Sequence, residues 1–211
     1  MFLRASIQGY KKYKDWYRNT RSSLINKFSS DYKIVAGLIA STSPRRDVQR
    51  NIRIAINIYK AYQNNPKQLI DEMINNKQVF CKKYELMNAH YNNVKRTLTH
   101  NYNKPLTLSG NKVNAFYNNM IGNYDYVTID IWMLRIFGLT KEAITSKKEY
   151  ANLSNILSEI AKEQNLLPAE LQAILWIKYK NEIGQEQIKN NKKQTIRFKP
   201  IDFKTYIEKF A

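Results

Sequence analysis

The scarcity of glycine and proline limits how this chain can fold more than any other feature of its sequence. Only six Gly and five Pro occur among 211 residues. An all-β chain of this length needs many tight turns, and those turns depend on these two residue types. The sequence therefore favours long helices, and we expect an all-α fold. With 43% hydrophobic residues, the chain can bury a core as one domain or as two small ones.

Apolar residues recur at helical spacing along most of the chain. Residues 32–41 contain a run that is apolar on all sides, which predicts a central helix. Ser43 and Pro44 have the residue types of a helix N-cap and a first helical position, and Thr128 is the expected cap of a later helix. The other predicted helices cover residues 1–30, 44–62, 66–74, 83–97, 146–164, 168–180 and 203–210, with a helix, a glycine turn, a helix, a turn and another helix in residues 106–139.

Basic residues outnumber acidic residues two to one. The chain has 35 Lys and Arg against 17 Asp and Glu, which gives a formal net charge of +18. Such an excess favours a polyanionic partner, and a nucleic acid is the partner that we expect. A bias toward AT-rich codons is the alternative explanation, although that bias would enrich Glu nearly as well as Lys. The charge excludes a neutral or acidic surface.

Cysteine and histidine are too few to build several common sites. Cys81 is the only cysteine, and His90 and His100 are the only histidines. This excludes an internal disulfide, a thiolate zinc site and a four-cysteine iron–sulfur cluster, so we expect no metal and no cofactor. The longest apolar run, residues 34–40, is too short to cross a membrane, and the first residues lack the apolar region of a signal peptide. We expect a cytoplasmic monomer that is neither secreted nor attached to a membrane.

A glycine turn opens directly into a predicted helix near the middle of the chain. Gly110 forms the turn, with Ser109 before it and Asn111 after it. Backbone N–H groups at such a helix start bind phosphate, so we predict that these three residues contact DNA. Lys112 follows in the first helical turn, and Asp130 lies at the start of the next predicted helix. The length of chain between them allows both side chains to face one cleft.

This stretch resembles the helix-hairpin-helix DNA glycosylases, typified by endonuclease III and the oxoguanine glycosylases. The signature of that family is a leucine, a Gly-x-Gly turn, a lysine on the second hairpin helix and a Val-Asp-x-His segment. The residues that match it in the same order are Leu106, Gly110, Lys112, Ala115 and Asp130.

The resemblance extends beyond the hairpin. Residues 37–48 and 84–96 are similar to two further segments of the family, so the likeness covers about residues 31–140. It implies a two-lobed helical globule of the glycosylase type. One lobe would comprise residues 31–126, with the hairpin at about residues 105–117, and the second lobe would comprise residues 1–30 and 127–211.

Several positions depart from the family pattern. Leu108 replaces the first hairpin glycine, Ile131 and Trp132 replace the polar-His pair after the aspartate, and the cysteines of an iron–sulfur cluster are absent. Ser41 or Thr42 stands where the family often has a glutamine that fills the gap left by a flipped base. We therefore include Thr42 among the expected DNA contacts.

The resemblance implies a DNA glycosylase that cleaves the N-glycosidic bond of a damaged or modified base, in DNA repair or DNA modification. Bond cleavage builds positive charge on the sugar, and Asp130 is the implied carboxylate that stabilises this charge. Lys112 stands where the family's lysine attacks the sugar C1′ and forms a Schiff base, which would add AP-lyase activity. Two alternatives stay open: a non-catalytic DNA-binding protein on the same scaffold, and a viral, phage-like enzyme of DNA base hypermodification.

Simpler roles compete with each of these functional interpretations. The competing role of Lys112 is a phosphate contact, and that of Asp130 is a helix cap. Arg45 and Arg46 follow Pro44 at a predicted helix start, where the helix dipole disfavours positive charge. We therefore predict that both arginines bind DNA phosphate, with solvated surface arginines as the alternative.

Overall fold

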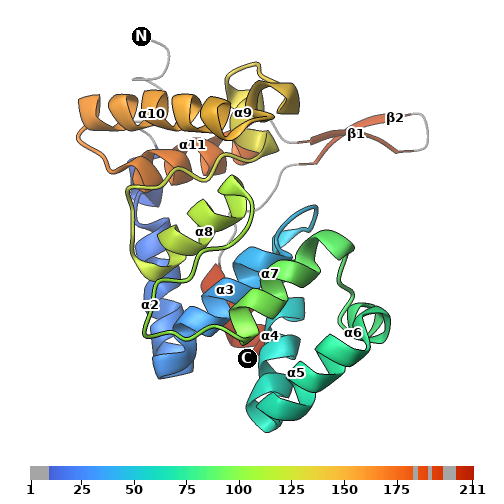
Figure 1. Ribbon diagram of the computed structural model, residues 1–211. Coiled ribbons are helices and arrows are strands. Elements are labelled where there is room, and N and C mark those ends of the chain that lie inside the picture. Colours follow the sequence, from blue (N-terminus) through green and yellow to red (C-terminus); the bar gives the residue numbers. More distant parts are fainter. Residues whose placement is uncertain (1–9, 183–184, 190–191, 197–202) are drawn as a thin grey trace. The chain divides into compact units, whose positions relative to one another are not determined.

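In the computed structural model of the chain, the regular secondary structure of the described residues is helical except for one two-stranded hairpin (Figure 1). It describes residues 10–182, 185–189, 192–196 and 203–211. Strands β1 (Gln185–Lys189) and β2 (Lys192–Ile196) pair antiparallel, with Gln187 opposite Gln194. The predominance of helix confirms the all-α prediction. Within the described ranges, no helix combines the length and the apolar character that crossing a membrane requires.

The chain divides into two compact units, each built from segments that lie far apart in the sequence. Unit 1 comprises Met1–Arg18 and Asn123–Asp202, whereas unit 2 comprises Asn19–Gly122 and Phe203–Ala211. Residues 1–9, 183–184, 190–191 and 197–202 of the predicted second lobe lie outside the described residues. Apart from residues 123–126 at the boundary, the predicted lobes differ from these units at residues 19–30 and 203–211. The second difference arises because α12 (Phe203–Phe210) packs against α4 (Val48–Asn64) and buries Ile207.

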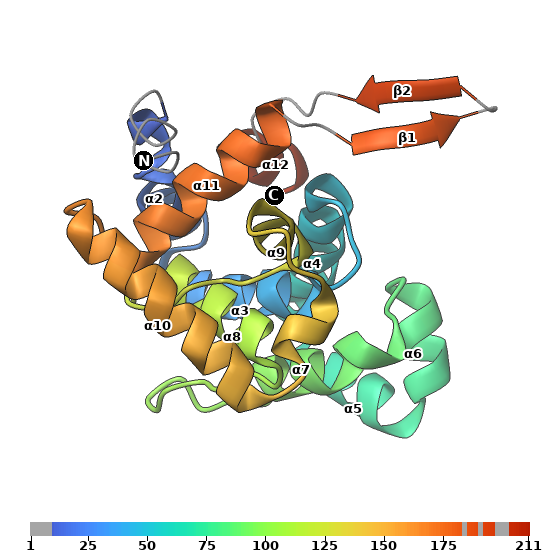
Figure 2. The same cartoon turned by 90° about the horizontal axis from the view of Figure 1, so that it is seen from above.

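Helix α3 (Tyr32–Thr42) is the centre of unit 2, as its apolar run predicts. Its residues from Val35 onward are buried, and it packs against α4, α7 (Asn88–Leu98) and α8 (Asn111–Ile121). Gly37 allows α7 to approach closely, because a Cβ at this position would lie 2.7 Å from Thr97 Cγ2. The remaining elements of unit 2 are most of α2 (Trp16–Phe28), which begins in unit 1, η2 (Ser29–Asp31), α5 (Pro66–Asn75) and α6 (Lys77–Lys83) (Figure 2).

Three helices build the core of unit 1. They are α9 (Ile131–Ile136), α10 (Lys147–Glu163) and α11 (Pro168–Glu182), and α11 packs against both of the others. Helices α10 and α11 lie side by side in Figure 1 and Figure 2. Two short 3-10 helices, η1 (Lys11–Tyr13) and η3 (Lys141–Ile144), flank them. The buried core residues are Val127, Ile129, Met133, Leu134, Tyr150, Leu157, Ala161, Leu171, Ile174 and Leu175.

A buried tyrosine holds the extended segment that leads into α9. The hydroxyl of Tyr150 donates to the carbonyl oxygen of Val127 at 2.8 Å and accepts from the backbone N–H of Ile129 at 3.0 Å. Burial is the main reason why the pKa of Tyr150 rises to about 12. The neutral hydroxyl therefore fixes the backbone immediately before Asp130.

The predicted start of the helix after α3 is wrong. Ser43 and Pro44 do not begin α4; instead Asp47 caps that helix by accepting from the backbone N–H of Arg50 at 2.9 Å. Arg45, which lies between Pro44 and Asp47, has a φ of +56°, which is incompatible with a continuous helix. The Ser43 hydroxyl donates back to the Ala40 carbonyl oxygen at the end of α3.

Three further predictions about helices are wrong in detail. The predicted helix at residues 83–97 is interrupted between α6 and α7, because Glu85 has a φ of +54°. Residues 99–110 contain no helix, so α7 is the helix that precedes the glycine turn. Asp130, rather than Thr128, caps α9, since helical hydrogen bonding begins at the Asp130 carbonyl oxygen, which accepts from Leu134.

Candidate nucleic-acid interface

The start of α8 presents exposed backbone at a helix N-terminus. Gly110 is the N-cap residue, and its φ of +90° lies in the left-handed region that favours glycine. Ser109 and Gly110 are exposed, and Asn111 is half-buried. Glycine offers no side-chain acceptor to the first N–H groups of the helix. This arrangement suits an anion, which can accept from those groups and interact favourably with the helix dipole.

Side chains from two helices fix the backbone of this turn. Buried Asn93 on α7 makes two bonds to Ser109: its amide nitrogen donates to the Ser109 carbonyl oxygen at 2.9 Å, and its Oδ1 accepts from the Ser109 N–H at 2.8 Å. Asn114 on α8 accepts from the backbone N–H of Leu108 at 3.0 Å. Leu108, which replaces the expected first glycine of the hairpin, is buried. The turn is therefore preorganised by hydrogen bonds and by an apolar anchor.

Lys112 connects the start of α8 to the loop after α3. It lies half-buried in the first turn of α8, and its Nζ donates to Ser43 Oγ at 3.1 Å. The same ammonium lies 5.9 Å from the centre of the Phe116 ring. These two contacts hold the ammonium beside the start of α8 and the loop after α3.

The loop between α3 and α4 carries two arginines with different environments. Arg45 is exposed and has the left-handed backbone described above. Arg46 is half-buried, and one terminal nitrogen donates to the Glu85 carbonyl oxygen at 2.6 Å. Among the described residues, the buried Nε of Arg46 has no hydrogen-bond partner. A buried guanidinium nitrogen without a partner is costly, which favours a role for water or a ligand at this loop.

His90 is bonded to the loop between α3 and α4. Its Nδ1 accepts from the Met87 backbone N–H at 3.3 Å, so its Nε2 carries the proton and donates to the Pro44 carbonyl oxygen at 3.0 Å. Burial is the largest cause of the lowered pKa of His90, and the charges of Arg46 and Lys112 lower it further. His90 is therefore neutral, and two cationic side chains act on the same small region.

Asp130 occupies the N-cap of α9 in unit 1. Its Oδ1 accepts from the backbone N–H groups of Trp132 and Met133, both at 3.0 Å, and its Oδ2 accepts from Trp176 Nε1 at 3.1 Å. The structure thus gives Asp130 the role of a helix cap whose second oxygen is held by an indole. These three bonds fix the orientation of a half-buried carboxylate.

The predicted site residues divide between the two units. The turn residues, Lys112 and the two arginines belong to unit 2, whereas Asp130 belongs to unit 1. Thr42 is a correction: its side chain is fully buried and donates to the Leu38 carbonyl oxygen, so it cannot contact DNA. Sequence reasoning missed Ser43, His90 and Trp176, whose roles depend on partners far away in the sequence and leave no local signal.

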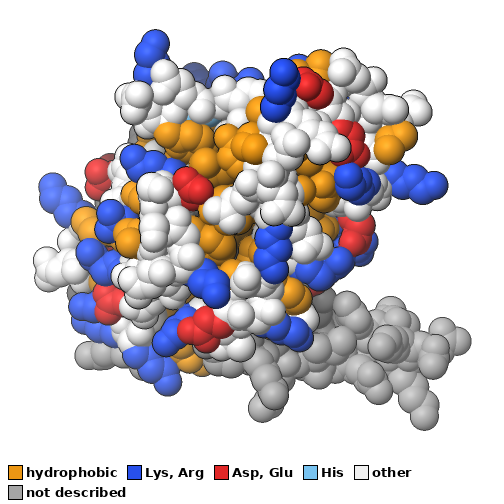
Figure 3. Space-filling model, turned by 90° about the horizontal axis from the view of Figure 1, so that it is seen from below, with side chains coloured by type: hydrophobic (Ala, Val, Ile, Leu, Met, Phe, Trp, Pro, Cys, Tyr) orange, Lys and Arg blue, Asp and Glu red, His pale blue; other side chains and the backbone are white. Residues whose placement is uncertain are grey.

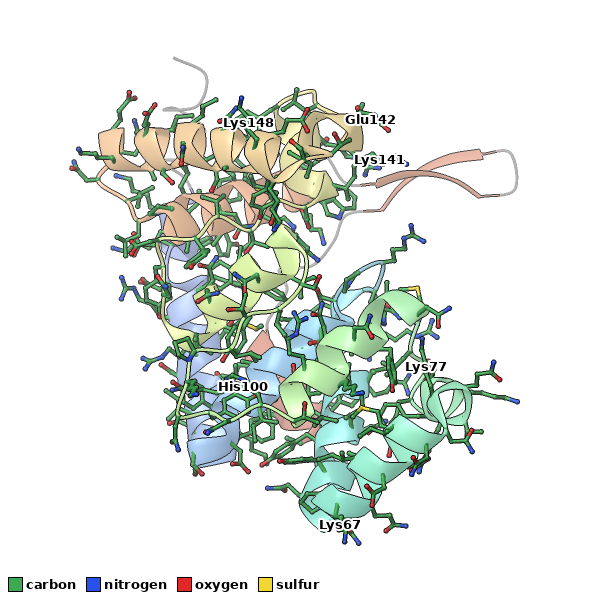
Figure 4. All side chains as sticks on the ribbon, in the orientation of Figure 1. Lys67, Lys77, His100, Lys141, Glu142 and Lys148 are labelled. Atoms are coloured by element: carbon green, nitrogen blue, oxygen red, sulfur yellow. The ribbon has the colours of Figure 1, made fainter. Side chains whose placement is uncertain are left out.

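Positive charge is also spread over the rest of the surface. Lys and Arg side chains outnumber Asp and Glu on the face shown in Figure 3. Lys67 and Lys77 of unit 2, and Lys141 and Lys148 of unit 1, lie exposed at the surface (Figure 4). Arg50 and Arg53, which follow the loop arginines on α4, share the single carboxylate of Glu85, with N–O distances of 2.7 Å in both pairs, so one positive charge of the three groups is left over. The start of α8 is therefore distinguished by its geometry rather than by charge alone.

Comparison with known proteins identifies one family. A family model described as a family of unknown function (DUF7178) matches residues 1–183. No curated protein and no solved structure matches the chain.

Proposed function

The chain belongs to the DUF7178 family, and we propose that it is a DNA-binding protein of the helix-hairpin-helix glycosylase type, which cleaves the N-glycosidic bond of a damaged or modified base. The observation that carries the proposal is the start of α8, where the exposed Gly110 turn stands beside Lys112. The proposal extends to the fold, which we infer to be a two-lobed glycosylase fold.

Phosphate binding is the first step of the proposed activity. A DNA phosphate would accept from the N–H groups of the first turn of α8 and would face the ammonium of Lys112. Exposed Arg45, on the loop that Lys112 contacts through Ser43, would supply a second cation. Because Asn93 already holds the turn, little conformational entropy is lost when the phosphate binds.

Asp130 and Lys112 are the proposed catalytic residues. As the bond between base and sugar breaks, the sugar gains positive charge, which the oriented carboxylate of Asp130 would stabilise. In the role that competes with the phosphate contact, the uncharged amine of Lys112 would attack C1′ as the base departs, which forms a Schiff base and leads to AP-lyase activity. That the two side chains serve one cleft stays a prediction, because they belong to different units.

A non-catalytic DNA-binding protein is the second candidate, and one observation favours it. Both oxygens of Asp130 accept hydrogen bonds within unit 1, so helix capping alone explains this residue. The two candidates differ in base release. Incubation with duplexes that carry uracil, hydroxymethyluracil, 8-oxoguanine or an alkylated base, followed by alkali, yields strand cleavage only for the first candidate.

The DNA-binding part of the proposal is tested by neutralising Lys112. We expect Lys112→Gln to weaken duplex binding and to reduce the slope of log Kd against log salt by about 0.9, which is the value for one phosphate contact. Lys67→Gln is the matched control, because it removes the same charge from an exposed position on α5. If the two variants lose equal duplex affinity, the start of α8 does not contact DNA specifically.

A further inference from the structure

Three half-buried aromatic side chains gather where α9 and α11 meet in unit 1. Trp132 comes from α9, and Trp176 and Tyr179 come from α11. The ring centres of Trp132 and Tyr179 lie 6.2 Å apart. Trp176 packs against the core of unit 1.

Two cations lie over the same rings. The Lys180 Nζ is 4.0 Å from the ring centre of Trp176 and 5.2 Å from that of Trp132, so one ammonium bridges both indoles. The Arg135 guanidinium lies 4.7 Å from the ring centre of Trp132. Each cation follows its tryptophan by one helical turn, which places the pair on one helix face.

The combination of rings and cations fits one kind of ligand. A nucleotide carries a flat base, which stacks on aromatic rings, and a phosphate, which pairs with lysine and arginine. Arg135 is exposed and Lys180 is half-buried, and each lies over a tryptophan ring. A nucleotide stacked on these rings would therefore have its phosphate close to both cations. A wholly acidic partner would engage the cations but would leave the rings unused.

We infer that the surface formed by Trp132, Tyr179, Arg135 and Lys180 binds an unpaired nucleotide of a nucleic acid, with its base on Trp132 and its phosphate on the two cations. The inference deepens the proposed function and rests on it, since DNA is the proposed partner. It names a contact that acts on unpaired bases, which is separate from the phosphate contact proposed at the start of α8 in unit 2.

The test is a titration of the full chain with short oligothymidylate, in which intrinsic tryptophan fluorescence reports binding. We expect quenching, and we expect Trp132→Ala to weaken binding by about 5- to 150-fold, the range for loss of one base–aromatic stack. Trp132→Phe keeps a ring and should lose only a few-fold. Lys180→Gln should reduce the salt slope by about 0.7. Lys178→Gln is its matched control, because Lys178 is on the same helix but lies over Tyr10.

Three outcomes would overturn the inference: wild-type affinity in Trp132→Ala, equal losses in Lys178→Gln and Lys180→Gln, or competition by polyglutamate as strong as that by oligothymidylate. The thermal unfolding midpoint of each variant checks that it is folded, and Trp132→Leu, which removes the ring but keeps a large apolar side chain, replaces Trp132→Ala if that variant does not fold. Lys112→Gln separates the two proposals. If duplex binding depends on neither Lys112 nor salt while oligothymidylate binding needs Trp132, the proposed function fails and this inference stands.

Discussion

Removing the hydroxyl of Tyr150 should destabilise unit 1 strongly although it removes only one atom. In Tyr150→Phe the ring remains in the core, but the Val127 carbonyl oxygen and the Ile129 N–H lose their partner. Both residues are 1% exposed, so water cannot replace the hydroxyl. An unsatisfied buried polar group costs about 1–3 kcal/mol, and we therefore expect a loss of about 2–4 kcal/mol in the free energy of unfolding.

The assay is urea and thermal unfolding followed by circular dichroism. For a chain of this size, each kcal/mol corresponds to about 2–4 °C in the unfolding midpoint, so Tyr150→Phe should unfold about 5–15 °C below wild type. Tyr179→Phe is the matched control, because Tyr179 is half-buried at the surface of the same unit, and it should change stability by less than about 0.5 kcal/mol. If both variants unfold at the wild-type midpoint, Tyr150 does not hold the segment before Asp130.

Two further predictions concern unit 2. The lowered pKa of His90 means that the unfolded chain binds a proton at this residue more readily than the folded chain. The resulting stability is fully present above the ordinary pKa of 6.5 and is lost as the pH falls below that value and through the lower pKa of the folded state. Urea midpoints at pH 5 and pH 7.5 should therefore differ less in His90→Gln than in wild type or in His100→Gln, and equal differences would contradict this explanation. Gly37→Ala should destabilise by about 1–3 kcal/mol, because its Cβ would lie 2.7 Å from Thr97 Cγ2; a neutral effect in urea unfolding would show that α7 moves away freely.

The sequence predicts the helices that have clear local signals. Ser146 and Pro168 mark the starts of α10 and α11, and Asn65 caps α5 by accepting from the Gln68 N–H. The apolar run in α3 predicts its central place. In each case the signal lies within one or two helical turns, where cap chemistry and side-chain spacing act directly.

The breaks between helices were harder to predict. Arg45 and Glu85 adopt left-handed backbone without a glycine, and tertiary contacts hold both segments: Arg46 donates to the Glu85 carbonyl oxygen, and His90 bonds Pro44. No local pattern reveals such contacts, since the partners are 39 and 46 residues apart.

The same limit applies to the candidate site. Gly110 and Lys112 were recognisable because a glycine turn before a helix is a local pattern. The contact of Asp130 with Trp176 depends on how α11 packs against α9, and the burial of Thr42 depends on the helices around α3. The sequence therefore indicates which residues bear the chemistry but does not show what surrounds them.

The central claim is that Asp130 acts on the glycosidic bond, and base release by Asp130→Asn tests it most directly. Wild type and variant are incubated with the panel of modified duplexes, alkali-labile sites are counted, and duplex affinity is measured in parallel. We predict that wild type releases a base from at least one duplex, whereas Asp130→Asn, whose amide oxygen can still cap α9, binds DNA normally and releases none. Equal base release by the variant and by wild type would contradict the claim.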